Sequence, residues 1–138
     1  MKQPQENIPL SFAGIIGQEK AKKLLHRAVE QNRLAHAFLF KGPMGVGKKT
    51  LARTFAAALN CQNQEGNEPC GRCPSCRKFR SGSHPDFLVI EPDGAAIKIN
   101  QVRELKKTLA FPPFEAKIRV ALLCDIHTMR REAANSLL

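Results

Sequence analysis

The segment GPMGVGK, residues 42–48, restricts the fold more than any other part of this chain. A short apolar run at 37–40 precedes it, and residues 48–60 follow it with apolar side chains at helical spacing. Glycines between a strand and a helix let consecutive backbone N–H groups curl around phosphate oxygens, and the helix N-terminus adds a positive dipole. The pattern predicts a phosphate-binding loop between a strand at 37–40, buried on both faces of a sheet, and a helix at 48–60.

The other periodicities extend this order of elements. Apolar residues at helical spacing predict an amphipathic helix over 20–31 with a basic polar face, and strands are expected at 86–90 and 118–124. Asn100 is the expected cap of a further helix that runs to about residue 110. Strands that alternate with helices predict an α/β fold with a mostly parallel sheet.

Charge and composition narrow the class of protein. The formal net charge is +10, and residues 1–80 carry 14 Lys and Arg against 5 Asp and Glu. Such a field favours polyanions, either nucleic acid or nucleotide phosphates. The chain starts without an apolar signal region, and no run approaches the roughly 18 apolar residues that a membrane span needs. We therefore expect a cytoplasmic protein without a membrane partner.

Two positions depart from the pattern of a nucleotide hydrolase. After Lys48 a Ser or Thr normally coordinates Mg²⁺, but Lys49 stands there, and Thr50 points about 100° away on a helix. The apolar strand at 118–124 ends in Asp125, and the next residue, often a Glu that activates water, is Ile126. We expect that ATP or ADP binding can survive without well-held Mg²⁺ while hydrolysis suffers; whether nucleotide binds at all stays open.

The residues expected at this degenerate nucleotide site are Gly42, Gly45, Val46, Gly47, Lys48, Lys49, Thr50 and Asp125. Strand alternation would place His127 on the same side as Asp125, although a lone histidine at a strand end is more often a surface or packing residue. No catalytic residue is predicted.

Four cysteines form a C-x8-C-x2-C-x2-C pattern: Cys61, Cys70, Cys73 and Cys76. In a reducing compartment this spacing predicts a structural zinc site that orders an otherwise coreless insert at 61–80. An iron–sulfur cluster is the main alternative, but the ferredoxin pattern needs a cysteine where Arg80 stands. Four sulfur ligands leave no open position for catalysis, and Cys124 is expected in the core.

A phosphate loop, one helix and a four-cysteine module before the second strand together resemble the delta-prime and gamma/tau subunits of the bacterial DNA polymerase III clamp loader. The similarity extends from "IIGQEKAKKLLHRAVEQNRLAHAFLFKGPMGVGKKTLARTFAAALNC" through "PCGRCPSCRKFRSGSHPDFLVIEPDG" to "IKINQVRELKKTLAFPPFEAKIRVALLCDIHTMRREAANSLL". It implies an AAA+ P-loop fold, with the adenine near Ile15, Ile16 and Gly17.

Lys49, Ile126 and the phrase HPDFLVIEPDG look more like delta-prime, which commonly lacks the catalytic residues of gamma/tau. The resemblance implies a stator that partners gamma/tau and delta subunits, meets primer-template DNA in the assembled complex and donates an arginine finger from beyond Leu138. The alternative is an active gamma/tau-type ATPase in which Thr50 or His127 compensates.

A third hypothesis is a zinc knuckle that binds nucleic acid through Arg72, Arg77, Lys78 and Arg80, with Phe79 as its only ring. The simpler interpretation is that these charged side chains keep the surface of the insert hydrated.

The chain ends at 133–138 within an apolar helical pattern. Relative to the resembling family this predicts a partial AAA+ domain over 1–138, truncated before a fourth strand. We expect such a fragment to self-associate through exposed sheet edges.

Overall fold

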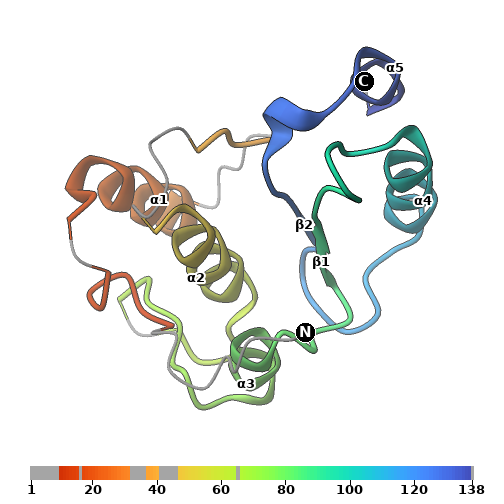
Figure 1. Ribbon diagram of the computed structural model, residues 1–138. Coiled ribbons are helices and arrows are strands. Elements are labelled where there is room, and N and C mark those ends of the chain that lie inside the picture. The colour runs from red at the N-terminus through yellow and green to blue at the C-terminus, as the bar shows by residue number, and fades with distance from the viewer. Residues whose placement is uncertain (1–9, 16, 32–36, 41–46, 65, 138) are drawn as a thin grey trace. The chain divides into compact units, whose positions relative to one another are not determined.

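The computed structural model of this chain describes residues 10–15, 17–31, 37–40, 47–64 and 66–137. Its contacts group into two compact units, residues 1–84 and residues 85–138, which are described separately below (Figure 1). The elements in chain order are α1 (Glu19–Gln31), α2 (Lys48–Asn60), α3 (Pro74–Ser81), β1 (Phe87–Ile90), α4 (Ile99–Leu109), β2 (Val120–Leu123), the 3-10 helix η1 (Ile126–Thr128) and α5 (Arg131–Leu137).

The first unit is built on the packing of α1 against α2. Both helices were predicted from their apolar spacing: α2 has the expected bounds, and α1 begins one residue earlier than expected, at Glu19. Their shared apolar cluster also includes residues of the segment that precedes α1, and its buried members are Phe12, Ile15, Leu25, Leu51, Phe55 and Ala58.

The strand predicted at 37–40 is not formed, and the expectation that both its faces are buried is wrong. Phe38 is 40% exposed and Leu39 is 58% exposed, although the Phe38 ring packs edge-on against Phe55 at 5.1 Å. Apolar composition cannot form a strand without neighbouring strands whose backbone groups complete its hydrogen bonds. The two strands in the described part of the chain pair with each other.

The insert at 61–80 contains a helix, α3, which the sequence analysis missed. Pro74 occupies its first turn, and Gly82 ends it in the left-handed region at φ 75°. Phe79 is fully buried against the ring of His84, with ring centroids 4.4 Å apart. Proline at the start and glycine past the end are known helix signals, so this element was recognisable despite its weak periodicity.

The second unit contains a parallel pair of strands, β1 and β2, in the register Phe87↔Val120 to Ile90↔Leu123 (Figure 1). Both strands were predicted, and the parallel pairing agrees with the expected α/β class. Helix α4 packs against α5, and its inner face contributes Val102 to a cluster with Ile97 and Ala133. The connection from β1 to β2 thus contains a helix, as parallel strands require.

The predicted start of α4 was wrong by two residues. Asn100 lies inside the helix, which begins at Ile99, and Lys98 is the capping residue. The Lys98 backbone N–H donates to Oε1 of Gln101 at 2.8 Å, so a side chain of the first turn satisfies the backbone donor of the capping residue. The described helices are each too short or too polar to cross a lipid bilayer.

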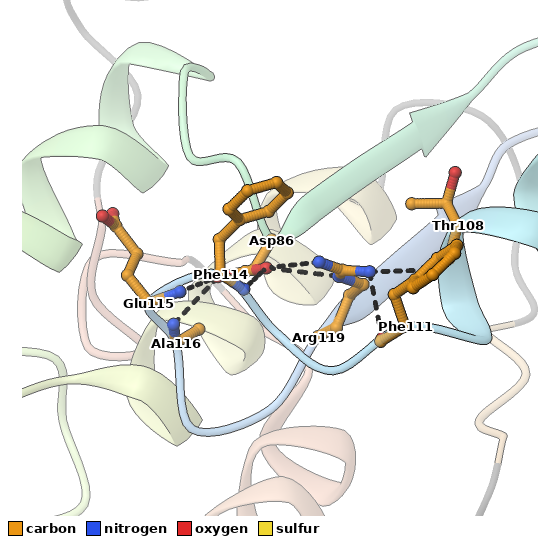
Figure 2. Close-up of polar contacts among 7 residues, drawn as sticks. All are labelled: Asp86, Thr108, Phe111, Phe114, Glu115, Ala116 and Arg119. Atoms are coloured by element: carbon orange, nitrogen blue, oxygen red, sulfur yellow. Dashed lines mark hydrogen bonds and ion pairs between the residues drawn. The ribbon is translucent and has the colours of Figure 1, made fainter.

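A buried carboxylate fixes the loop that leads into β2. Both Asp86 and its partner Arg119 are almost inaccessible, with side-chain exposures of 0% and 6%, and their Oδ1 and Nη2 atoms are 3.1 Å apart (Figure 2). Three backbone N–H groups also donate to the Asp86 carboxylate at 2.8–2.9 Å, those of Phe114, Glu115 and Ala116. Burial alone would raise the pKa of Asp86, but these donors and Arg119 together hold it well below its ordinary value.

Arg119 also ties this loop to α4. Its Nη1 atom donates to the carbonyl oxygens of Thr108, in the last turn of α4, and of Phe111 (Figure 2). The guanidinium carbon lies 5.7 Å from the centroid of the Phe114 ring. One ion pair therefore positions both the end of α4 and the start of β2, the strand that carries Asp125 at its carboxyl end.

Candidate metal centre and nucleotide loop

The four predicted cysteines converge in the first unit. Their Sγ atoms all lie within 4.8 Å of one another, and the side chains come from the end of α2, the following loop and α3. Cys61, Cys73 and Cys76 are buried, and Cys70 is half-buried. The Sγ atoms of Cys70 and Cys76 are 3.9 Å apart, which matches the roughly 3.8 Å between sulfurs around a tetrahedral ion with metal–sulfur bonds of about 2.3 Å.

Backbone N–H groups surround the sulfur atoms. Those of Asn63 and Cys70 point to Sγ of Cys61 at 3.4 and 3.2 Å, and those of Arg72 and Cys73 point to Sγ of Cys70 at 3.3 and 3.2 Å. Such donors stabilise thiolate charge and hold ligand sulfurs in place. These four cysteines are not paired in disulfides, so the cluster has the donor set and the spacing to hold a metal ion.

The environments of the four sulfurs differ in their effect on ionisation. The backbone N–H groups of Arg72 and Cys73 lower the pKa of Cys70 to about 6. Burial raises the pKa of Cys61 and, more strongly, that of Cys76. The buried thiols must lose protons when they become metal ligands, so metal binding at this cluster will depend on pH.

Only part of the predicted nucleotide site lies within the described residues. Gly42, Gly45, Val46 and Ile16 lie outside them. Gly47 precedes α2 with φ 85°, in the left-handed region that glycine adopts without strain, and the Leu51 N–H donates to its carbonyl oxygen at 2.8 Å. A Cβ atom built on Gly47 would lie 3.9 Å from Cγ2 of Ile15. The end of the phosphate-binding loop and Ile15 of the predicted adenine region thus belong to one unit. Gly17, also predicted for the adenine region, lies in the same unit and is exposed.

The first turn of α2 is basic. It begins with the half-buried Lys48 and the exposed Lys49, and it contains no acidic residue. Thr50 is half-buried, and its carbonyl oxygen accepts a hydrogen bond from Oγ1 of Thr54 at 2.8 Å. Two cationic side chains and the positive end of the helix dipole therefore coincide, which favours an anion at this position.

The end of β2 differs from the prediction in one respect. Asp125 follows the strand as expected and is exposed, but its backbone adopts the left-handed conformation, with φ 53° and ψ 50°. The chain then turns into η1, so strand alternation does not extend to His127, which is exposed on that short helix. The prediction that His127 shares a side with Asp125 rested on an extended backbone that the structure does not have. Asp125 and the loop at α2 belong to different units.

The basic insert does not present a stacking ring. Phe79, the aromatic residue on which base stacking by the insert would depend, is 0% exposed. Arg72 and Arg77 are exposed, whereas Lys78 and Arg80 are half-buried. Base stacking contributes much of the affinity of proteins for single strands, so the hypothesis of a nucleic-acid-binding knuckle loses its aromatic component.

Comparisons with known proteins agree with this combination of features. Residues 17–138 match the family model described as DNA polymerase III, delta subunit. The tau/gamma subunit of DNA polymerase III from Haemophilus influenzae is 37% identical over 130 residues, which cover 94% of this chain and 19% of that protein. The delta' subunit from Bacillus subtilis is 36% identical over 121 residues, 88% of this chain and 36% of that protein. The tau subunit from Bacillus subtilis is 35% identical over 131 residues, 94% of this chain and 23% of that protein.

The small parallel sheet and the mixed order of helices and strands fit the α/β class and the AAA+ type of clamp-loader subunit. The chain belongs to the family of DNA polymerase III clamp-loader subunits. It spans about a fifth to a third of the length of these three relatives. Delta' and tau/gamma relatives match at similar identity, so these comparisons do not distinguish the two subunit types.

Proposed function

We propose that this chain is part of a clamp-loader subunit of the delta-prime type, which acts in DNA replication as a stator with a degenerate ATP site. The observation that carries the proposal is Lys49 at the start of α2, where a hydrolytic subunit needs a hydroxyl to hold Mg²⁺. Within the assembly its partners are gamma/tau and delta subunits and primer-template DNA.

The geometry of α2 supports binding without hydrolysis. Gly47, Lys48 and the helix N-terminus retain the features that attract phosphate oxygens. Lys49 adds a second positive charge, which offsets phosphate charge in place of a metal ion but supplies no oxygen ligand for Mg²⁺. Triphosphate is therefore expected to bind in a form that Mg²⁺ does not strengthen.

The end of β2 supports the same conclusion. Asp125 could hold a metal ion through water, but the residue that should activate the attacking water is Ile126, which is 43% exposed and has no ionisable group. An aliphatic side chain can neither accept a proton nor orient water, so a general base is missing as well. Two separate parts of the hydrolytic machinery are therefore altered.

We propose structural Zn²⁺ as the ion of the four-cysteine cluster. Four cysteine sulfurs within 4.8 Å of one another favour zinc or an iron–sulfur cluster, and a single ion explains why all four lie so close together. Zinc held by four sulfurs has no open position for water or substrate. Its role would then be to fix the insert against the end of α2.

The test is phosphate release by the purified full-length protein alone. We expect a rate at least about 100-fold below that of an intact tau subunit in the same assay, because loss of one electrostatic stabiliser of a transition state typically costs about 100- to 1,000-fold. Calorimetric titration with ATP should give the same affinity with and without Mg²⁺. Lys48→Ala is the control, and it should abolish the binding.

An active gamma/tau-type subunit predicts the opposite result. Phosphate release comparable to that of tau, lost in the Lys48→Ala variant, would refute the stator proposal and would show that Thr50 or His127 compensates. Release that persists in the Lys48→Ala variant would come from a contaminating enzyme.

A further inference from the structure

Glu68 links the four-cysteine insert to the segment that precedes α1. It lies two residues before Cys70, and its carboxylate contacts residues outside the sulfur cluster. Its Oε2 atom accepts hydrogen bonds from Oγ of Ser11 at 3.2 Å and from the backbone N–H of Phe12 at 2.9 Å. Its Oε1 atom lies 3.4 Å from Nε2 of His26 in α1. One half-buried side chain of the insert therefore contacts two other parts of the first unit.

The contacts of Glu68 lead to residues 10–15, here called the buttress segment. Phe12 is 1% exposed, and its ring packs edge-on against His26 with centroids 4.5 Å apart. The Ile15 N–H donates to the Phe12 carbonyl oxygen at 3.2 Å, which closes a turn, and Lys22 of α1 donates to the Ile15 carbonyl oxygen. The position of Phe12 therefore constrains that of Ile15.

Ile15 in turn lies against the start of α2. It is 6% exposed, packs in the same apolar cluster as Leu51, and lies 3.9 Å from the position of a Cβ on Gly47. The buttress segment thus supports the residue at which the phosphate loop enters its helix. A shift of Phe12 would be transmitted through packed side chains, which have few alternative arrangements.

The hydrogen bonds that Glu68 accepts can transmit the metal-binding state of the insert to the buttress segment. Glu68 is close to the cysteine cluster in the sequence, because only Pro69 separates it from Cys70. The N–H of Cys70 points to Sγ of Cys61 at 3.2 Å. Ligand bonds at Cys61 and Cys70 would fix this stretch of backbone and thereby the carboxylate. A charged acceptor on a fixed backbone holds an amide more strongly than one on a mobile loop.

We propose that Glu68 is a positioning residue that couples the four-cysteine metal site to the phosphate loop through the buttress segment. The inference rests on the proposed metal and nucleotide sites. Coupling between two binding sites is reciprocal, so bound nucleotide should also strengthen retention of the metal. In the absence of metal, Glu68 would lose its fixed position and the buttress segment would open.

The test uses full-length Glu68→Ala and Glu68→Gln, with Glu104→Ala as a control because Glu104 forms an exposed pair with Lys107 in the other unit. Hydrogen exchange of peptides covering residues 10–15 is measured before and after removal of zinc with a chelator. Metal content and ATP affinity are measured on the same samples. Peptides from α4, in the other unit, serve as an internal reference for general unfolding.

In the wild type and in Glu104→Ala, zinc removal should raise exchange in the buttress segment at least tenfold above any change in α4. Glu68→Ala should retain zinc, show the raised exchange already with metal bound, and bind ATP several-fold more weakly. Glu68→Gln keeps an oxygen acceptor for the Phe12 N–H but loses the negative charge 3.4 Å from Nε2 of His26, so it should restore most of the protection.

Three results would overturn the coupling: full protection of residues 10–15 in zinc-loaded Glu68→Ala, an equal response of that variant and the wild type to zinc removal, or loss of zinc in both Glu68 variants. The last would mean that Glu68 maintains the metal site itself. The exchange experiment needs no nucleotide. A wild type that binds no ATP would therefore refute the proposed nucleotide site, whereas the hydrogen-exchange results would still decide whether the metal site is coupled to the buttress segment.

Discussion

Full-length protein in which Cys76 is replaced by Ser is expected to lose its zinc and the ordered fold of the insert. Cys76 is 0% exposed, and it lies in the first turn of α3, where its N–H points to Sγ of Cys73 at 3.4 Å. A serine hydroxyl is a poor zinc ligand, and three thiolates hold the ion far less tightly than four. Structural zinc contributes about 10–16 kcal/mol to the folding of small zinc-finger peptides, which is comparable to the whole stability of a domain.

Metal analysis of the purified protein and its thermal unfolding curve check this prediction. The matched control is Cys124→Ala, because Cys124 is also buried but belongs to the second unit and not to the cluster. The control should keep one zinc per chain and lose only the small packing contribution of a buried thiol. Stoichiometric zinc in Cys76→Ser, or wild-type protein that purifies without any metal, would contradict the assignment of a four-cysteine zinc site.

Asp86→Ala is expected to lower the free energy of unfolding by about 3–5 kcal/mol, because it leaves the buried Arg119 without its partner. Three backbone N–H groups also lose their acceptor in this variant. Urea unfolding near pH 7 measures the loss. Asp93→Ala is the matched control: Asp93 pairs with Lys98 at 3.2 Å on the surface, with side-chain exposures of 69% and 54%. Its removal should change the free energy by no more than about 0.5 kcal/mol.

The contribution of Asp86 to the free energy of unfolding should decrease at acidic pH. Its pKa is lower in the folded protein than its ordinary value of 3.8, so the folded state favours the ionised carboxylate. The stabilisation is therefore fully present above about pH 4 and is lost as the pH falls toward the folded pKa. The difference between wild type and Asp86→Ala should be constant from pH 5 to pH 8 and shrink below pH 4. A difference that shrinks near neutral pH instead would exclude this carboxylate as its source.

Much of the local structure could be predicted from residue spacing. The apolar period of 48–60 correctly indicated α2, because a helix that packs on one side must repeat its apolar residues with its own geometry. The nearly all-apolar run at 118–124 correctly indicated β2. The four cysteines were also recognisable, since close spacing in the chain keeps ligands within reach of one ion. These features depend on residues a few positions apart.

The stretch at 37–40 shows where such reasoning fails. It has the composition of a buried strand, yet Leu39 is mostly exposed and no strand forms there. Whether an apolar run becomes a strand depends on partners elsewhere in the chain, which its own composition does not specify. The helix α3 is the opposite case, because its weak period is compensated by the burial of Phe79 and by the cysteine contacts.

The residues that connect distant parts of the chain were not found in advance. Asp86 and Arg119 are separated by 33 positions, and Glu68 reaches back 56 positions to Phe12. Nothing in the local sequence marks these carboxylates, because any acidic residue can lie at the surface. Periodicity and spacing were enough to indicate most of the elements and the cluster of four cysteines, whereas the burial of a charge and the partner that compensates it exist only after the elements have packed together.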